Sequence, residues 1–390
     1  MNTKVLALAV VAILAVAGIG TVMFLNDDDD PSTITIIDGA NNKIELDEPL
    51  KKVAVLNKNV PTTMKMLGLD DTVVCYYYGT NKLGLNVEEL AKTETDRNLG
   101  TYYTPSVETL LKYGVEAVIC PVSSMTIYSS VQKSCEQNGI KVIRLDCNGD
   151  TLFDDLSKLS KVFGDPESAT SKINAYQSER TAMINAIVAS LDGVELYDHL
   201  TVFGSRDSIY NESSAMSDLL DLIFDKNVTS YTNLDTDTVT NPVNTNSQEE
   251  IAQVEDKIDV LLMRTDHTGT DGITSVKADS YDRFVGTGGV TLVNTSSLVY
   301  QNSRIYSVES DLMSGLYGHI GLLVLVKVIY GIDVDGYEDI NKVITDFQEE
   351  YGQSEIGATS GKSAKDNTDL VYQFGANGST EPVLEYVKSS

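Results

Sequence analysis

Residues 51–75 read KKVAVLNKNVPTTMKMLGLDDTVVC, and this stretch decides the fold class. An apolar strand over 53–56 leads through a polar loop into a short helix over 62–67, which stops at Gly68. A second apolar strand over 72–75 follows. Continuous apolar strands that alternate with helices are typical of a mostly parallel sheet covered on both faces. The stretch therefore predicts an α/β fold.

The same unit recurs in the first half of the chain. An alternating segment over 33–46, with a turn near its middle, predicts a β-hairpin before the first strand. Further strands are expected over 117–120 and 141–145, with a helix over 129–137 between them. These elements complete a first α/β lobe.

A long helix separates the two halves. Asp165 and Pro166 supply a cap and a first-turn proline, and apolar positions keep a helical period until Gly193. The helix is expected to run for about 26 residues, or about 40 Å, which is enough to bridge two domains. The second half repeats the α/β pattern, with expected strands over 200–203, 258–263 and 304–308 and expected helices over 216–224, 316–330 and 337–351.

These patterns predict an α/β fold of two doubly wound lobes with mostly parallel sheets, joined by one long, rigid helix. The predicted segments are an anchor or signal segment over 1–30, an N-terminal α/β lobe over 31–160, a bridging helix over 161–193, a C-terminal α/β lobe over 194–351 and a polar tail over 352–390. The tail prediction rests on the polar, Gly- and Ser-rich composition that begins at Gly352.

The N-terminus carries the strongest local signal. Residues 5–25 are 21 consecutive uncharged residues, enough to cross a hydrocarbon core as a helix. Lys4 on one side and the aspartates 27–30 on the other orient this segment with its N-terminus inside the cell. A cleaved signal peptide is the alternative, because residues 15–17 have cleavage-like spacing. The rest of the chain is expected to be extracytoplasmic, anchored to the cell membrane where the helix is retained.

The cysteines and the glycosylation sequons are both compatible with an extracytoplasmic location, but neither set establishes it. The four cysteines have spacings unlike any CxxC metal or redox motif, and they allow up to two disulfides. They are Cys75, Cys120, Cys135 and Cys147. Four Asn-x-Ser/Thr sequons offer sites for glycans, although chance occurrence is the alternative. They begin at Asn211, Asn227, Asn294 and Asn377.

The chain is strongly acidic. Its 57 Asp and Glu against 29 Lys and Arg give a formal net charge of −28, which repels phosphate backbones, so nucleic acid is not an expected partner. No hydrolase, nucleotide or dinucleotide motif is complete, so the sequence predicts neither an enzyme nor a bound cofactor. The three histidines, His199, His267 and His319, all lie in the second half, which argues against a histidine-built zinc or manganese receptor.

Aromatic loops at the expected carboxyl ends of strands form the candidate ligand site, because open α/β sheets bind ligands there. Tyrosine offers a flat apolar face and a hydroxyl, and its phenolate can bind ferric iron or haem. Arginines beside strands of the second half can pair with anionic ligand groups. The candidate ligand contacts are Asn59, Tyr77, Tyr78, Tyr102, Tyr103, Arg206 and Arg264. Ordinary half-buried packing is the alternative for any one tyrosine, since the chain has 20.

Several short motifs, in their order along the chain, resemble one known family. They are the hairpin with Leu50-Lys51-Lys52-Val53-Ala54-Val55, then Asn59-Val60-Pro61-Thr62, Leu99-Gly100, Ser106-Val107-Glu108, the long helix, and Ser303-Arg304-Ile305-Tyr306. Over roughly residues 33–351 the chain is similar to extracytoplasmic solute-binding proteins of ABC importers for ferric siderophores, haem and cobalamin, the helical-backbone (class III) family. Ser303 stands where that family usually has glycine.

The resemblance implies a ligand cleft between the lobes and docking of a permease through a first-turn glutamate on each lobe, Glu108 and Glu249. It implies a membrane-anchored substrate-binding component that captures an iron(III) chelate, such as a siderophore, and delivers it to an ABC permease dimer with its ATPase. A cobalamin or haem receptor of the same family is the alternative ligand hypothesis. A surface adhesion or sensory module on this fold is the alternative from another functional class.

Overall fold

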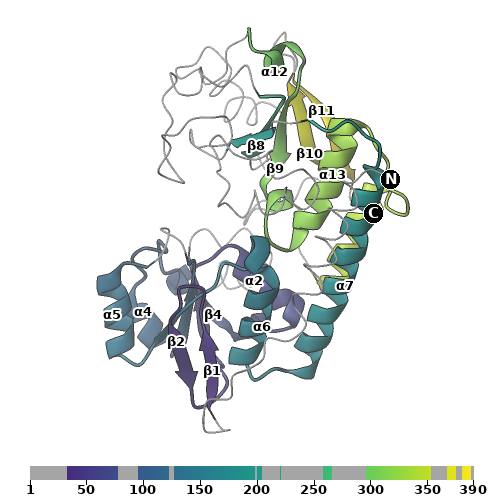
Figure 1. Cartoon of the computed structure of the whole chain (residues 1–390). Helices are drawn as coiled ribbons and strands as arrows, with labels where there is room; N and C mark the ends of the chain where they lie inside the picture. The colour runs from purple at the N-terminus through teal and green to yellow at the C-terminus, as the bar shows by residue number, and fades with distance from the viewer. Residues whose placement is uncertain are drawn as a thin grey trace. The chain divides into compact units, whose positions relative to one another are not determined.

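The structure is a computed structural model that describes residues 33–77, 95–122, 127–197, 200–203, 220, 258–265, 296–352, 367–374 and 380–387 (Figure 1). These residues divide into two compact units. The N-terminal unit contains the described residues within 33–179 and 346–352, and the C-terminal unit contains those within 180–345 and 367–387. Each unit has its own β-sheet and helices, so the predicted α/β class is confirmed.

Two helices are shared between the units. The predicted long helix is α7 (Glu167–Ser190), 24 residues long, which begins in the N-terminal unit and ends in the C-terminal unit. Helix α14 (Ile340–Tyr351) begins in the C-terminal unit and ends in the N-terminal one. Within the N-terminal unit, Tyr176 of α7 contacts Phe347 and Tyr351 of α14, with ring centroids 6.2 and 5.7 Å apart. The chain therefore passes between the units more than once.

The N-terminal unit is built on a parallel sheet with the strand order β4-β3-β5-β6. Its strands are β3 (Val53–Val55), β4 (Val73–Tyr76), β5 (Ala117–Cys120) and β6 (Lys141–Arg144). Since β4 lies on one side of β3 and the later strands lie on the other, the topological switch point falls between β3 and β5. The predicted hairpin is present as the antiparallel pair β1 (Ile34–Ile37) and β2 (Lys43–Leu46).

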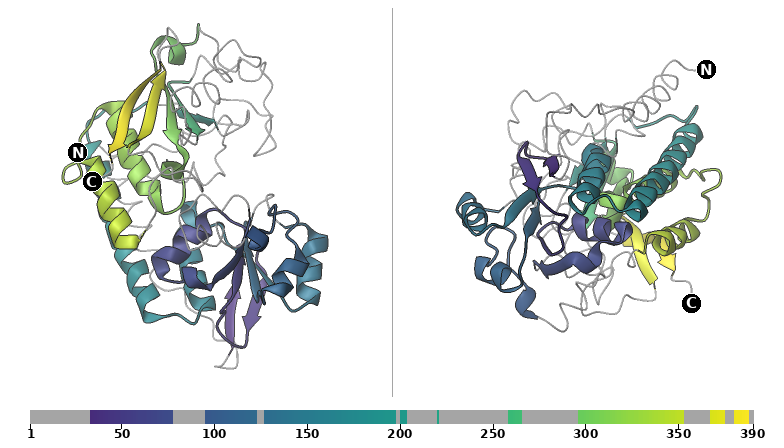
Figure 2. Two further views of the ribbon diagram at one scale, coloured as in Figure 1. Left: turned by 180° about the vertical axis from the view of Figure 1, so that it is seen from behind. Right: turned by 90° about the horizontal axis from the view of Figure 1, so that it is seen from below.

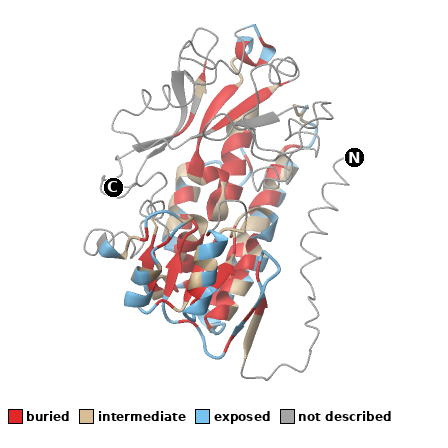
Figure 3. Ribbon diagram, turned by 90° about the vertical axis from the view of Figure 1, so that its left-hand side faces the viewer, coloured by how far each residue is buried: buried red, intermediate tan, exposed pale blue. Residues whose placement is uncertain are grey.

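Helices cover both faces of this sheet (Figure 2). They are α2 (Asn59–Leu67), α4 (Val107–Lys112), α5 (Ser129–Gln137) and α6 (Leu152–Val162). Helices α4 and α5 lie on one face, and α2 and α6 lie on the other. The strand side chains are nearly all buried between them (Figure 3). Burial on both faces explains why these strands are continuous apolar runs rather than alternating ones.

The C-terminal unit contains a mixed five-stranded sheet with the order β11-β10-β9-β8-β7. Strands β7, β8 and β9 are parallel, whereas β10 is antiparallel to both β9 and β11. The strands are β7 (Leu200–Phe203), β8 (Val260–Thr265), β9 (Ile305–Glu309), β10 (Asn367–Phe374) and β11 (Thr380–Val387), and the helices are α12 (Leu298–Gln301) and α13 (Gly318–Tyr330). Of the helix predicted over 216–224, only Leu220 is described, and it is helical and buried.

Short 3₁₀ helices connect several of these elements. They are η1 (Asp70–Thr72), η3 (Thr95–Arg97), η4 (Gly149–Thr151), η8 (Ser310–Met313) and η9 (Gly315–Tyr317). Helix α2 ends as the sequence predicts, because Gly68 adopts a left-handed conformation with a φ of 74° and its N–H donates to the Lys65 carbonyl at 3.0 Å.

The polar tail predicted over 352–390 is wrong for residues 367–387, because β10 and β11 complete the C-terminal sheet. Leu370, Val371 and Phe374 of β10 are buried. Strand β9 is itself buried along its whole length, so its N–H and C=O groups need a strand partner on that edge. Strand β10 supplies that partner, and the non-local pairing overrides the polar composition around it.

The turn before β9 also departs from the pattern of the family that the sequence resembles. Ser303 has a φ of 54°, in the left-handed region that glycine adopts at the least cost. Its N–H donates to the Tyr300 carbonyl at 3.0 Å, and its own carbonyl accepts from Nε2 of Gln373 in β10 at 2.7 Å. These bonds hold Ser303 in a conformation that glycine adopts more easily.

Within the described ranges, no helix is long and apolar enough to cross a membrane. The anchor predicted over 5–25 lies outside those ranges, and so do all four sequon asparagines. Membrane anchoring and glycosylation therefore stay predictions from the sequence.

Replacing Phe374 by alanine tests the placement of β10. The free energy of unfolding should fall by about 3–5 kcal/mol, the usual range for truncating a buried aromatic side chain. Urea denaturation followed by far-UV circular dichroism measures this change. Phe374→Leu is the matched control and should lose less stability, because it retains most of the buried apolar volume. No loss of stability in Phe374→Ala would mean that residues 367–374 are not part of the core.

Candidate functional site

The carboxyl ends of β3, β4, β5 and β6 define one edge of the N-terminal sheet, called the carboxyl edge below. Asn57 and Asn59 follow β3, Tyr77 follows β4, and Asp146 and Cys147 follow β6. In open α/β sheets, ligands bind at this edge, next to the topological switch point. The residues that follow these strands are therefore the candidate site.

The two asparagines after β3 hold the loop after β6. Nδ2 of Asn57 donates to the carbonyls of Leu145 and Asp146, at 2.8 and 3.3 Å. Nδ2 of Asn59 donates to the same Asp146 carbonyl at 3.2 Å, while its backbone N–H donates to Oδ1 of Asn57 at 2.9 Å. Asn59 was predicted to contact the ligand. It lies at the expected edge, but its side-chain amide nitrogen positions the neighbouring loop.

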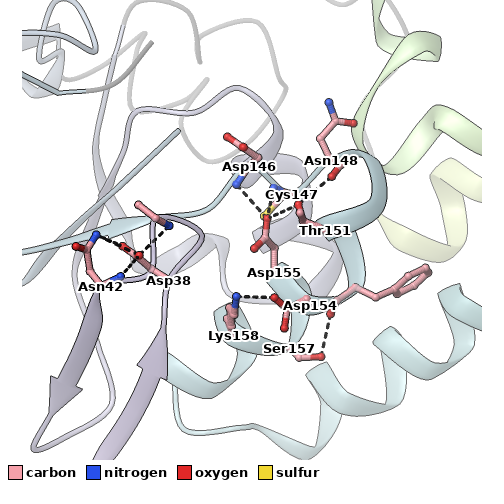
Figure 4. Close-up of polar contacts among 12 residues, drawn as sticks. Asp38, Asn42, Asp146, Cys147, Asn148, Thr151, Asp154, Asp155, Ser157 and Lys158 are labelled. Atoms are coloured by element: carbon pink, nitrogen blue, oxygen red, sulfur yellow. Dashed lines mark hydrogen bonds and ion pairs between the residues drawn. The ribbon is translucent and has the colours of Figure 1, made fainter. Parts of the chain in front are cut away.

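The buried carboxylate of Asp155 fixes the loop after β6 through hydrogen bonds (Figure 4). Oδ2 of Asp155 accepts hydrogen bonds from the backbone N–H groups of Asp146 and Cys147, at 3.0 and 2.8 Å, and from Oγ1 of Thr151 at 3.1 Å. Burial raises the pKa of Asp155 above its usual range, and the donated hydrogen bonds partly oppose that rise. Cys147 has a φ of 49°, and the bond from its N–H to Asp155 helps to stabilise this left-handed conformation.

The turn of the β1–β2 hairpin closes against the same edge. Asp38 is buried, and its carboxylate accepts from the backbone N–H groups of Ala40 and Asn42, the latter drawn in Figure 4. It also accepts, at 3.1 Å, from the backbone N–H of Arg144 at the end of β6. The N–H of Gly39 donates to the Arg144 carbonyl at 2.8 Å. A Cβ on Gly39 would lie 2.4 Å from Cγ2 of Val122, so only glycine allows this close approach.

Four tyrosines at the carboxyl edge make a continuous series of ring contacts, and we call Tyr77, Tyr102, Tyr103 and Tyr128 the tyrosine ladder. The rings of Tyr77 and Tyr102 meet edge to face, with centroids 5.5 Å apart. Tyr102 and Tyr103 lie 4.2 Å apart, and the Tyr102 hydroxyl donates to the Tyr103 hydroxyl at 3.1 Å. Tyr103 and Tyr128 are stacked, with centroids 5.4 Å apart and planes 25° from parallel.

The tyrosine ladder runs from the core of the unit to its surface. Tyr77 and Tyr102 pack against the apolar cluster between the sheet and helices α4 and α5, whereas Tyr128 is 55% exposed. Burial raises the pKa of Tyr77 to about 12, so its phenol is neutral at physiological pH. Tyr77 therefore supports the outer rings, and a phenolate role for it is disfavoured.

The structure brings together three of the seven predicted ligand contacts, Tyr77, Tyr102 and Tyr103. It adds Tyr128, which the sequence analysis missed. Tyr128 immediately precedes the helix that follows β5, so the rule that selected Tyr77 after β4 also applies to it. Tyr78 and Arg206 lie outside the described residues, and so does the side chain of Arg264, whose backbone belongs to β8.

Glu108, the predicted docking residue, lies in the first turn of α4 and is exposed. Ser106 caps that helix, with its Oγ accepting from the N–H of Thr109 at 3.2 Å. At the other end of α4, Nζ of Lys112 pairs with Asp96 at 2.6 Å, which fixes the helix to the segment after β4. Glu249, the second predicted docking residue, lies outside the described residues.

The described part of the chain offers no group of three or more His, Cys, Asp or Glu side chains that could hold a metal ion. His319 is fully buried in α13, and burial, with a smaller effect of Arg180, lowers its pKa to about 3. It is therefore a neutral core residue. His199 and His267 lie outside the described residues.

All four cysteines are free and buried in the N-terminal unit. Cys75, Cys120 and Cys135 belong to the same apolar cluster, and Cys147 lies at the carboxyl edge. Burial raises the pKa of Cys75 to about 12 and also raises those of Cys135 and Cys147. The disulfides that the sequence allowed are therefore not formed.

The structure is similar to solved periplasmic binding proteins. CeuE from Helicobacter pylori, in a nickel–histidine complex, is 14% identical with a TM-score of 0.59, over 83% of this chain and 97% of that one. A periplasmic haem-binding protein from Pseudomonas aeruginosa is 14% identical with a TM-score of 0.52, over 72% and 93%. A protein of an ABC-type Fe3+-hydroxamate transport system from Saccharomonospora viridis is 16% identical with a TM-score of 0.50, over 76% and 98%.

No protein-family model matches the sequence, and a search of curated protein sequences finds no relative. The likeness therefore lies in the fold, which is the two-unit α/β fold of periplasmic solute-binding proteins. The sequence resemblance to class III solute-binding proteins predicts the same fold, and the structural neighbours confirm it.

Replacing Asp155 by alanine tests whether it organises the carboxyl edge. It leaves the N–H groups of Asp146 and Cys147 without their acceptor, at a cost of about 1–3 kcal/mol for each group, so the free energy of unfolding should fall by about 2–6 kcal/mol. Urea denaturation measures the loss. Asp154→Ala is the matched control on the same helix. Asp154 is itself exposed, so its ion pair with Lys158 contributes less than about 1 kcal/mol, and equal losses in the two variants would contradict the assignment.

The state of the cysteines is measured by titration with a thiol reagent at pH 7 to 8. The native protein should show no fast-reacting thiol, because all four thiols are buried and inaccessible to the reagent. In denaturant without reductant, four thiols should titrate per chain. Two thiols or none after unfolding would show that disulfides form and that the structure of this cluster is wrong.

Proposed function

We propose that this protein is the extracytoplasmic substrate-binding component of an ABC importer and that its cargo is an iron(III) chelate. The observation that carries the proposal is the tyrosine ladder at the carboxyl edge of a parallel sheet, beside the switch point. Tyrosine rings supply large, rigid, amphipathic contact surfaces. The fold supports the proposal, because the solved structures that share it include haem-binding and Fe3+-hydroxamate transport proteins.

The proposed protein binds and releases its cargo without chemical change. The acidic groups at the carboxyl edge have structural assignments: Asp155 holds two backbone N–H groups, and Oδ1 of Asp146 accepts from the N–H of Val122 at 2.9 Å. Arg206 and Arg264 are proposed to pair with anionic groups of the chelate. Cobalamin and haem are the alternative cargoes for the same site.

The proposed partner is an ABC permease dimer with its ATPase, docked through Glu108 and Glu249. Glu108 is suited to this role because it is exposed in the first turn of a helix that Ser106 caps and that an ion pair from Lys112 to Asp96 links to the segment after β4. Residues 5–25 are proposed to anchor the protein to the membrane, which would keep it beside the permease.

The first test is a binding titration of the full chain in detergent. Because the chain has 20 Tyr and no Trp, its intrinsic fluorescence comes from tyrosine, and quenching of that fluorescence measures binding of a chelate. Ferric catecholates, ferric hydroxamates, haem and cobalamin form the panel. Saturable binding of an iron chelate is the expected result. A folded sample that binds nothing in the panel would contradict the proposal and favour an adhesion or sensory module.

Reversing both docking charges, in a Glu108→Lys and Glu249→Lys variant, separates transport from binding. Uptake of the cargo by cells should fall by at least about tenfold, because like charges would face the permease arginines that the family resemblance implies. Affinity for the cargo should be unchanged. Glu167→Lys is the matched control, since Glu167 is also an exposed first-turn glutamate, on α7, and should leave uptake intact. Normal uptake in the double variant would rule out docking through these residues.

A further inference from the structure

The outermost ring of the tyrosine ladder has a distinctive environment. Tyr128 is one of the few large apolar side chains in the described residues that are strongly exposed, at 55%, although it belongs to an aromatic series that begins in the core. One of its faces stacks on Tyr103, with the ring planes 25° apart. An aromatic ring has two faces, and this degree of exposure leaves the second one open to solvent.

The backbone around Tyr128 is held in place. Its N–H donates to the Tyr103 carbonyl at 3.0 Å, so the two residues are joined by a main-chain bond as well as by their rings. Its own carbonyl accepts from the N–H groups of Val131 and Gln132, both at 2.9 Å, at the start of α5. A ring fixed in this way loses little conformational entropy when a ligand stacks on it.

The ladder below Tyr128 is also ordered by its own contacts. The Tyr102 hydroxyl donates to the Tyr103 hydroxyl at 3.1 Å, which sets the relative position of these rings. Tyr77 packs behind Tyr102 against the apolar cluster of the unit. The exposed face of Tyr128 is therefore the end of a rigid aromatic stack.

We propose that Tyr128 is a specificity-determining residue, and that its open face stacks on a flat conjugated ring of the cargo. This inference rests on the proposed function and narrows its ligand class. An aromatic ring stacks best on another flat ring, in an offset arrangement. The aryl groups of a catecholate chelate and the macrocycle of a porphyrin both have this chemistry, whereas a hydroxamate chelate built on aliphatic chains does not.

Affinity measurements on the full chain in detergent test the proposal with three probes: a ferric tris-catecholate, iron protoporphyrin IX and an aliphatic ferric trihydroxamate. Tyr128→Ala should weaken binding of the ring-bearing cargo about 3- to 10-fold, the usual effect of one aromatic contact. Tyr128→Phe should bind within about twofold of the wild type, because the stacking face is kept. Comparing the tris-catecholate with iron protoporphyrin IX shows whether the cargo ring that stacks on Tyr128 is a catechol or a porphyrin.

Leu111→Ala is the matched control, since Leu111 is 48% exposed on α4 of the same unit, and it should leave affinity unchanged. Unchanged far-UV circular dichroism and urea midpoints confirm that Tyr128→Ala is folded. Equal affinity of Tyr128→Ala and the wild type for a bound ring-bearing probe overturns the inference. Binding of the trihydroxamate alone also overturns it while the proposed function stands, whereas a folded protein that binds none of the probes refutes the proposed function itself.

Discussion

The buried carboxylate of Asp155 is the interaction on which the carboxyl edge depends. Taking this charge out of water is unfavourable, and two backbone N–H groups and one hydroxyl offset that cost. They fix the loop after β6, whose carbonyls then accept from Asn57 and Asn59 after β3. Asp146 in the same loop accepts from Val122 after β5. The ends of three strands are thus joined into one rigid frame.

The tyrosine ladder lies at the same edge and is held by apolar packing instead of hydrogen bonds to a buried carboxylate. Its inner rings pack on the cluster that contains Cys75, Cys120 and Cys135, and its outer ring lies at the surface. These three cysteines are buried among the same apolar side chains and form no disulfide. A polar frame and an aromatic stack together preform the proposed binding edge, which would lower the entropy lost on ligand capture.

The path of the chain connects this edge to the rest of the molecule. Helix α7 leaves the N-terminal unit and α14 returns to it. There, Tyr351 packs on Tyr176, and its hydroxyl donates a hydrogen bond to the Glu179 carboxylate at 2.7 Å. The chain then contributes β10 and β11 to the C-terminal sheet. Residues far apart in sequence therefore complete each unit, so neither unit corresponds to one continuous half of the chain.

The α/β class, the strands from β3 to β6, the long helix and the end of α2 at Gly68 all follow from the sequence, because apolar periodicity and capping act over a few residues. The sequence also placed Tyr77, Tyr102 and Tyr103 at the expected edge. The three-dimensional fold adds that Tyr128 joins them, that Asp155 holds the β6 loop and that residues 367–387 form strands. Each of these depends on a partner distant in sequence, and the strand order that brings the partners together is set by long-range packing.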